Sequence, residues 1–499
     1  MVMALAFALF VTNQYDPDFW WSIRIGQLIM DMGRVPHHLP WTFTAATHTF
    51  IAQEWGSEVI YALLWMHGGM IGVILLTAAV TWVGLLAAMA CIPRSVSMLG
   101  RVLAVLLLLV AGDATWGPRA QMFTFAGVGV VFWVLRTRWN DDRWRWSLVP
   151  IIWFWSQVHG GFSYGLGVFG VYLVGATLQT WFTHTKLDKL SSWWRTFAAS
   201  VLVVGINPNW FGVYVYVFKL LHDKAILAFY QEWQSPNFHD PRMWALLIII
   251  FLIASAAWTK RLYRTDLAEA LVLAAAAFWA FDAIRNVADF CLIVLPFVAV
   301  GIDGVFLKMG VKLRAGDAPA QNNRSHLLPW VTMLIGLVLA ISLMIPQVFS
   351  PSNEQFSSAY PVSVADWVCA HPQITRLYGS PDWNGWLLSA IDPTGTPAGS
   401  CTSVRVEMFG ELPTMGDPVI YKSIAVAAGN YNALQILQQW RVQAAWVYAH
   451  TSLAELLTLD PTRWQLVMHN GVNEIFVLRS LRLPYPGKLD YAINSRSMG

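Results

Sequence analysis

The chain has 499 residues, of which 56% are hydrophobic and 12% are charged, and its mean hydropathy is +0.49. A soluble protein of this size carries about 25% charged residues, so the composition predicts a polytopic membrane protein and excludes an ordinary soluble enzyme. The net charge of +3 gives no support for nucleic-acid binding, because the basic residues gather at one set of membrane ends, where they anchor topology.

Eleven stretches are long enough, or nearly long enough, to cross a bilayer. The first begins with residues 1–12, which are apolar but short and lack the basic flank and the small-residue cleavage site of a signal peptide. We therefore expect residues 1–15 to form the end of a first membrane helix. The full set comprises 1–15, 69–92, 101–116, 120–136, 147–158, 160–182, 196–206, 243–258, 266–283, 289–306 and 328–349.

The loops between these stretches alternate in kind. One set is plainly basic, and the positive-inside rule places it in the cytoplasm. The other set mixes acidic, basic, amide and aromatic residues and is therefore expected outside. With a cytoplasmic N-terminus, an odd number of crossings also puts residues 350–499 outside. The basic loops carry Arg94/Arg101, Arg136/Arg138/Arg143/Arg145, Lys186/Lys189, Lys260/Arg261/Arg264 and Lys308/Lys312/Arg314.

Two outer loops, residues 13–68 and 207–242, are long. Apolar residues recur at helical spacing after Asp18, which predicts an amphipathic helix over 19–33 lying in the membrane interface. The second loop has a helix-like middle and a polar, proline-containing end. We expect both loops to cover the outer side of the helix bundle.

Residues 350–499 differ in character from the rest. Short apolar runs alternate with the helix-like run YNALQILQQWR, which indicates a compact α/β domain. Cys369 and Cys401 fall there, and their spacing leaves open whether they form a disulfide. The predicted fold is an α-helical polytopic membrane domain with about 11 transmembrane helices over residues 1–349, followed by an extracytoplasmic α/β domain.

The sharpest feature is the pair Asp16 and Asp18, which flanks a proline directly after a membrane helix. Carboxylates near hydrocarbon are costly and often functional. One can act as a general base toward an acceptor hydroxyl, while the other orients it or binds a divalent cation. The structural alternative is an N-cap for the following helix.

Arginine is disfavoured on the outer side, yet Arg119 and Arg285 are expected there. The planar guanidinium fork suits the oxygens of a phosphate group, as on a lipid carrier. The alternative is a pair of buried ion pairs, with Asp282 or Asp289 as the partner of Arg285.

Three further residues complete the predicted substrate site. Glu54 can face the same cavity or can favour the start of a helix through the helix dipole. His159 precedes two glycines that permit close approach, and it can bind phosphate or sugar or be structural. Glu232 belongs to the outer cluster EWQSP. The predicted substrate-binding residues are therefore Glu54, Arg119, His159, Glu232, Asp282 and Arg285.

The order of these motifs resembles the GT-C superfamily of glycosyltransferases, and in particular mannosyltransferase-like bacterial membrane proteins. The resemblance covers most of residues 13–300. It rests on DPDFWWSIRIGQLIMDMGRVP, WTFTAA, EWGSEVIYALL, GPRAQMFTF, WSQVHGGFSYG, INPNWFGVYVY, EWQSPNF and DAIRNVADFCLIVLPF.

The resemblance implies transfer of a sugar, with inversion, from a polyprenyl-phosphate donor to a glycan, lipid or protein acceptor outside a bacterial inner membrane. Asp16 and Asp18 occupy the place of the family's acidic pair, and residues 19–33 that of the helices covering its lipid groove. No cofactor is required, although Mg²⁺ or Mn²⁺ held by the acidic pair is compatible with the reaction. In the family a His often stands where this chain has Ser22, and a D-G-R-like stretch where it has residues 404–407.

Two other functions remain open. The first is a non-catalytic scaffold or accessory subunit that kept the fold within a membrane complex. The second is a lipid or solute transporter. Against a transporter, the two halves of the chain show no matching pair of helices broken by Gly or Pro.

Overall fold

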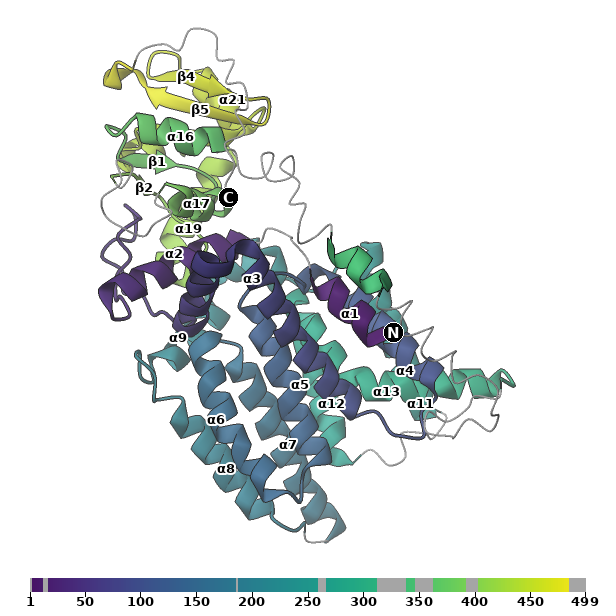
Figure 1. Cartoon of the computed structure of the whole chain (residues 1–499). Coiled ribbons are helices and arrows are strands. Elements are labelled where there is room, and N and C mark those ends of the chain that lie inside the picture. Colours follow the sequence, from purple (N-terminus) through teal and green to yellow (C-terminus); the bar gives the residue numbers. More distant parts are fainter. Residues whose placement is uncertain are drawn as a thin grey trace. The chain divides into compact units, whose positions relative to one another are not determined.

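The computed structural model describes residues 2–11, 17–184, 187–258, 266–311, 338–345, 362–391 and 403–483. The chain divides into two compact units (Figure 1). The first unit comprises residues 1–15, 53–221 and 227–350, and the second comprises 16–52, 222–226 and 351–499. Residues 16–52, expected in an outer loop of the membrane domain, thus cluster with the C-terminal part of the chain.

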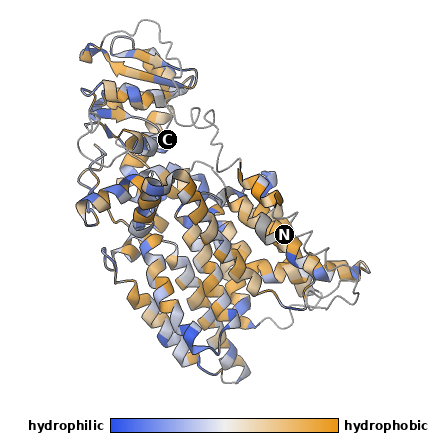
Figure 2. Cartoon of the chain, in the orientation of Figure 1, coloured by the Kyte–Doolittle hydropathy of each residue, from blue (hydrophilic) through white to orange (hydrophobic). Residues whose placement is uncertain are grey.

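The first unit is helical, and its helices are largely hydrophobic (Figure 2). Short 3-10 turns punctuate the ends of the long helices. The end of α9 and the start of α10, residues 222–226, belong to the second unit. The elements are α1 (Val2–Phe10), α3 (Trp55–Ala90), α4 (Met98–Ala111), η1 (Asp113–Thr115), α5 (Gln121–Thr137), α6 (Asp142–Val158), α7 (Phe162–Thr183), α8 (Leu190–Val203), α9 (Gly212–His222), α10 (Lys224–Phe229), η2 (Gln231–Trp233), η3 (Pro241–Met243), α11 (Trp244–Trp258), α12 (Leu267–Asp282), η4 (Ile284–Asn286) and α13 (Val287–Lys308).

Every stretch before residue 310 that the sequence predicts as apolar and helical corresponds to a helix. Among the described residues, three helical segments are long and apolar enough to cross a membrane, namely Trp55–Ala90, Phe162–Thr183 and Ile284–Lys308. Shorter apolar helices are Met98–Ala111, Gln121–Thr137 and Pro241–Ala257. The number of eleven crossings stays a prediction.

Close packing holds the long helices together. α3 and α5 approach so closely that a Cβ on Gly84 would lie 2.7 Å from the carbonyl oxygen of Phe125, and one on Gly129 would lie 2.5 Å from that of Gly84. α13 is buried along most of its length. Near its end, the Asp303 carboxylate accepts hydrogen bonds from the backbone N–H of Ser97 (2.7 Å) and the Ser97 hydroxyl (2.5 Å). These bonds tie the start of α4 to α13.

The second unit combines helices with a five-stranded sheet of order β2-β1-β3-β5-β4. The β2–β1 and β1–β3 pairs are parallel, whereas the β3–β5 and β5–β4 pairs are antiparallel. The elements are α2 (Pro17–Met32), α16 (Val362–Ala370), β1 (Arg376–Tyr378), α17 (Pro381–Ala390), β2 (Arg405–Val406), α18 (Leu412–Met415), α19 (Asp417–Ala427), α20 (Ala433–Gln439), β3 (Ala444–Tyr448), α21 (Ser452–Thr458), β4 (Trp464–His469), β5 (Asn473–Leu478) and η5 (Arg479–Leu481).

Backbone pairing explains why residues 16–52 join the second unit. Thr42 bridges Val406 in parallel, so this segment extends the sheet beyond β2. The N–H of Val406 donates to Trp41 O (2.9 Å), and the N–H of Phe43 donates to Val406 O (3.1 Å). α2 also packs on α17, because Gly385 leaves room for the side chain of Trp21.

The interior of the second unit is aromatic. Trp383 stacks on Trp446, with ring centroids 4.5 Å apart, and both rings are fully buried. Trp383 and Trp386 are both buried and therefore pack in the core of this unit. Cys369 is disulfide-bonded, whereas Cys401 lies outside the described residues.

Candidate functional site

Two arginines share one carboxylate in the first unit. Glu232 Oε2 lies 3.0 Å from Arg119 Nη2, and Glu232 Oε1 lies 3.1 Å from Arg285 Nη1. Both guanidinium side chains are about 15% exposed, whereas the Glu232 side chain is 35% exposed. The two planar cations are therefore held side by side by a single anion.

Short turns position these side chains. Arg119 lies just before α5, and Arg285 lies in η4, between α12 and α13. The N–H of Ile284 donates to Gln234 O (2.9 Å), which holds η4 against the segment carrying Glu232. The Arg285 guanidinium lies 4.3 Å from the centre of the Trp233 ring, a cation–π contact.

The Arg285 ion pair differs from the expected one. Sequence proximity suggested Asp282 or Asp289 as the partner, but the arginine pairs with Glu232, which is 53 residues away. Asp282 is exposed at the end of α12, and its backbone oxygen lies 3.5 Å from the Ser235 hydroxyl. The turn geometry decides the partner, because η4 faces the 231–234 segment.

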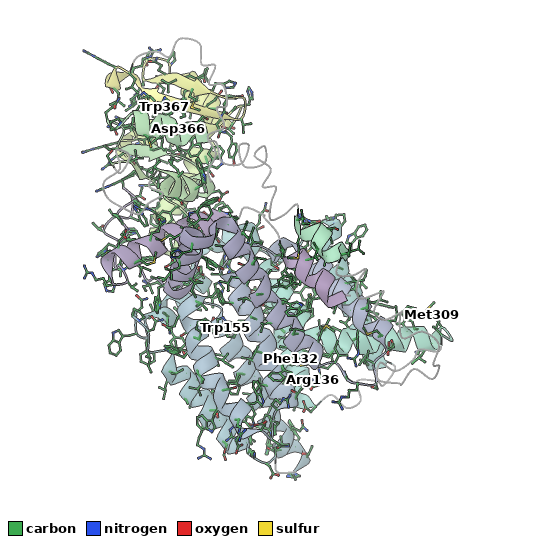
Figure 3. All side chains as sticks on the ribbon, in the orientation of Figure 1. Phe132, Arg136, Trp155, Met309, Asp366 and Trp367 are labelled. Carbon is green, nitrogen blue, oxygen red and sulfur yellow. The ribbon has the colours of Figure 1, made fainter. Side chains whose placement is uncertain are left out.

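His159 and Glu54 form the neighbouring part of the site. The imidazole Nε2 faces Glu54 Oε1 at 3.4 Å. His159 Nδ1 accepts from the N–H of Gly161 (3.1 Å) and lies 2.5 Å from the Thr124 hydroxyl, which in turn accepts from the Trp155 indole N–H (3.1 Å). This chain places the imidazole proton on Nε2, toward Glu54. Trp155 lies among the helices of the first unit (Figure 3).

Gly161 is necessary for this chain of hydrogen bonds. A Cβ at Gly161 would lie 2.0 Å from the Thr124 hydroxyl and 2.8 Å from His159 Nδ1. Any side chain here would separate the two groups. The expectation that the glycines after His159 permit a close approach is thus explained by a contact between α5 and the α6–α7 turn.

Electrostatics differ sharply between the acidic groups. Burial by itself raises the pKa of Glu232, but the positive charges of Arg285 and Arg119 outweigh burial and bring the pKa to about 2. Burial raises the pKa of Glu54 to about 7, against the lowering effect of Gln53 and the two arginines. Burial, followed by the charges of Arg285 and Arg119, lowers the pKa of His159 well below its usual value. At neutral pH Glu232 is therefore ionised and His159 is neutral.

Five of the six predicted substrate-binding residues thus come together. They lie at the ends of helices that are far apart in sequence but share one end of the first unit. We call this set the arginine cluster: Glu54, Arg119, His159, Glu232 and Arg285. Asp282 is the predicted member for which no contact of the side chain with the cluster is found.

Asp18, one of the two predicted catalytic residues, belongs to the second unit. Asp18 lies in the first turn of α2, where its Oδ1 accepts from the Trp21 indole N–H (3.1 Å) and its backbone oxygen accepts from Ser22 (2.7 Å). Asp16 lies outside the described residues. Among the described residues, no group of three or more His, Cys, Asp or Glu side chains comes together to hold a metal ion. A cation at Asp16 and Asp18 stays a prediction.

Sequence reasoning missed the residues that hold the cluster in place. Thr124 and Trp155 lie inside apolar helices, where neither spacing nor charge distinguishes them. Gln121 donates from Nε2 to Arg285 O (2.9 Å). Its position two residues after Arg119 was the one available signal.

An apolar groove of about 500 Å³ opens between α4, α11 and α13 of the same unit. Its lining is almost entirely hydrocarbon and aromatic, and it includes Leu103, Leu107, Trp244, Ile248 and Phe306. Several of these side chains are exposed in the isolated chain. Such a surface suits a hydrocarbon chain.

No family model matches the chain, and no curated protein matches it. Its fold, however, matches solved structures. The apo oligosaccharyltransferase of Archaeoglobus fulgidus aligns with a TM-score of 0.57 at 12% identity over 90% of this chain and 69% of that one. AglB of the same organism, in complex with an inhibitory peptide and a dolichol-phosphate, aligns with a TM-score of 0.57 at 10% identity over 97% and 74%. The chain has the fold of the GT-C glycosyltransferases. The fold that the motif resemblance implied is therefore confirmed.

Proposed function

We propose that this chain is a membrane glycosyltransferase. It moves a sugar, with inversion, from a polyprenyl-phosphate carrier to an acceptor hydroxyl on the outer face of the membrane. The observation that carries the proposal is the pair of guanidinium groups, Arg119 and Arg285, held together by Glu232. A site with two forks and one carboxylate keeps a net positive charge for a phosphate group.

The phosphate is proposed to bind on the donors that Glu232 leaves available. Arg285 has five N–H donors and gives one, from Nη1, to Glu232. Its ring contact with Trp233 fixes the plane of the fork. Because the guanidinium is mostly buried, its interaction with a phosphate is screened less by solvent than that of a surface arginine.

His159 contributes as a neutral donor in this proposal. Its proton is on Nε2, and its lowered pKa keeps the ring uncharged at neutral pH. Glu54, beside it, changes charge near pH 7. The site therefore holds a fixed positive pair and one acidic group whose charge depends on pH.

The chemical step needs a base, and Asp18 or Asp16 is proposed for that role. The acceptor oxygen attacks the anomeric carbon, its proton passes to the carboxylate, and the bond between that carbon and the phosphate oxygen breaks. The leaving polyprenyl phosphate gains negative charge, which the two arginines stabilise.

The solved structures add support for the carrier. AglB binds a dolichol-phosphate, which is a polyisoprenoid phosphate of the proposed class. In this chain, the groove between α4, α11 and α13 offers an apolar surface for such a chain. With this function we propose a multi-pass location in a bacterial inner membrane, with the N-terminus in the cytoplasm and the C-terminal domain outside. The proposed acceptor is a glycan, a lipid or a protein.

The binding test compares two arginines on neighbouring segments. Undecaprenyl phosphate is titrated onto the purified full chain and onto Arg285→Gln, with Arg242→Gln as the matched control. Arg242, in η3, is exposed and forms an ion pair with Asp240 just before that turn. We expect Arg285→Gln to weaken binding about 10- to 100-fold, since a hydrogen bond to a charged group contributes about 1.5–3 kcal/mol. Equal affinities in the two variants would contradict the proposal.

The scaffold alternative makes a different prediction. A non-catalytic subunit of a membrane complex uses the Arg119–Glu232–Arg285 bridge only to hold its turns in place. Arg285→Gln would then lower thermal stability without changing carrier binding. Measuring both quantities on the same variant separates the two functions.

A further inference from the structure

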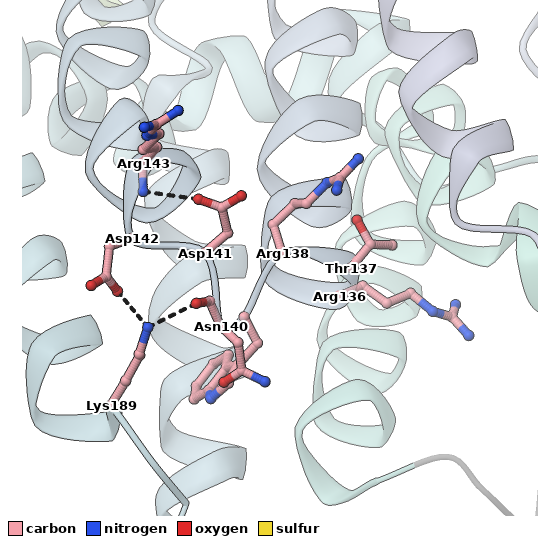
Figure 4. A pocket seen from close by; sticks show the side chains of 9 residues that line it. Arg136, Thr137, Arg138, Asn140, Asp141, Asp142, Arg143 and Lys189 are labelled. Carbon is pink, nitrogen blue, oxygen red and sulfur yellow. Dashed lines mark hydrogen bonds and ion pairs between the residues drawn. The ribbon is translucent and has the colours of Figure 1, made fainter.

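A second charged site lies at the other end of α5 and α6. An open pocket of about 680 Å³ is lined by the α5–α6 connection and the start of α8 (Figure 4). We call it the cationic pocket, and its lining residues are Arg136, Thr137, Arg138, Trp139, Asn140, Asp141, Asp142, Arg143 and Lys189. α5 has 17 residues, so this pocket and the start of α5 near Arg119 are about 25 Å apart along the helix axis.

Four of the pocket's charged groups are already engaged. Arg136 turns away from Lys189 (Figure 4) and pairs with Glu269 at 3.1 Å. Lys189 Nζ donates to Asn140 O (2.7 Å) and to Asp142 Oδ1 (2.8 Å), so it closes one side of the pocket. Both acidic residues of the lining are occupied too, because Asp141 caps the start of α6 and Asp142 also binds Arg145.

Arg138 and Arg143 are the other two charged residues of the pocket lining. Both are exposed, and neither forms an ion pair with a carboxylate of the described residues. The Arg138 guanidinium lies 5.0 Å from the Trp133 ring centre and 6.0 Å from that of Trp144. Aromatic contacts thus hold the plane of this guanidinium, while no carboxylate in the described part of the chain accepts from its N–H groups.

The surroundings of the pocket suit a lipid headgroup rather than a soluble anion. Trp144 and Trp146 of α6 are exposed, and indole rings of this kind favour the headgroup level of a bilayer. The pocket belongs to the basic loops that the positive-inside rule places in the cytoplasm, where anionic lipids attract Lys and Arg. Cationic groups, a cavity and exposed indoles therefore occur together.

We propose that the cationic pocket binds the phosphate of an anionic phospholipid, with Arg138 and Arg143 as its charge partners. The site is separate from the arginine cluster and does not depend on glycosyl transfer. It gives the chain a fixed lipid contact at the cytoplasmic ends of α5, α6 and α8.

The experiment measures lipid binding to the purified full chain by native mass spectrometry. Phosphatidylglycerol is titrated against phosphatidylcholine, and inorganic phosphate serves as the soluble anion. The test variant is Arg138→Gln with Arg143→Gln, and the matched control is Arg94→Gln with Arg195→Gln. Arg94 and Arg195 are exposed, and both are expected on the cytoplasmic side, as the pocket is. The test and control variants each lose two positive charges.

We expect phosphatidylglycerol to bind the test variant about tenfold more weakly than the natural chain, and to bind the control with little change. A variant with Arg138→Lys and Arg143→Lys should recover part of the affinity. Equal losses in the test and control variants would overturn the proposal, as they would show general surface attraction. Displacement of the lipid by inorganic phosphate alone would overturn the assignment to a lipid.

Discussion

The arginine cluster and the cationic pocket lie at opposite ends of α5 and α6, and they hold positive charge in different ways. In the cluster, Arg119 and Arg285 come from distant segments, are mostly buried and share the Glu232 carboxylate. In the pocket, Arg138 and Arg143 are close neighbours in sequence and are exposed. The comparison indicates that a buried shared anion orients both guanidinium groups of the cluster, whereas aromatic rings orient Arg138 in the exposed pocket.

The largest effect is expected from a variant that changes the proposed base and leaves both cationic regions intact. Replacing Asp16 and Asp18 by Asn should lower glycosyl transfer by about 10²–10⁴-fold, the usual contribution of a general base. Binding of undecaprenyl phosphate and of phosphatidylglycerol should stay unchanged. Single-turnover transfer and native mass spectrometry on one preparation test this, and undiminished transfer would remove the acidic pair from the mechanism.

Removing the shared anion should affect the cluster alone. Glu232→Gln leaves two neighbouring guanidinium groups without their carboxylate, so we expect a loss of stability of about 1–2 kcal/mol, reduced by the partial exposure of Glu232. Added undecaprenyl phosphate should restore stability, because its phosphate supplies the missing negative charge. Thermal unfolding with and without the lipid measures both effects, and a variant as stable as the natural chain would contradict this account.

The Glu232 carboxylate also makes the stability of the chain depend on pH. Because the pKa of Glu232 is lowered to about 2, its stabilising contribution is complete above about pH 4.5 and is lost as the pH falls toward 2. Glu232→Gln should remove this acid-dependent part of the unfolding curve. The matched substitution Asp240→Asn, in an exposed pair, should leave most of it in place.

Salt should weaken lipid binding at the two regions to different extents, because the cluster is buried and the pocket is exposed. Raising the ionic strength from about 0.1 M to 1 M shortens the screening length from about 10 Å to 3 Å. We expect phosphatidylglycerol binding at the exposed pocket to fall several-fold, and undecaprenyl phosphate binding at the cluster to fall less. Parallel titrations at two salt concentrations measure the difference, and equal losses would show that burial does not distinguish the sites.

The smallest effect should come from Glu54. Burial brings its pKa to about 7, so the group is neutral below that pH and negative above it. An added negative charge opposes a phosphate, and affinity for undecaprenyl phosphate should therefore fall roughly threefold between about pH 6 and pH 8. In Glu54→Gln the decline should disappear, while the cationic pocket should show no corresponding change in either chain.

Much of the cluster could be predicted from the sequence because its members stand where helices end. Arg119 and His159 are polar residues at the ends of apolar stretches, and hydropathy marks those positions directly. The partner of Arg285 could not be predicted in this way. It depends on one backbone hydrogen bond between Ile284 and Gln234, which no local pattern encodes.

The assignment of Asp18 to the second unit was also beyond the sequence. Its segment joins that unit through the pairing of Thr42 with Val406, which are 364 positions apart. Hydropathy shows where a chain leaves an apolar stretch but not which distant strand it joins. The helices of the first unit were easier to predict, because their apolar residues are contiguous.

The most direct test of the account is a cryo-EM map of the full chain with undecaprenyl phosphate bound. We expect density for the phosphate within hydrogen-bonding distance of the Arg119 and Arg285 guanidinium groups, with the prenyl chain continuing over apolar helix surface. Phosphate density elsewhere, with both arginines still paired to Glu232, would contradict the proposed site.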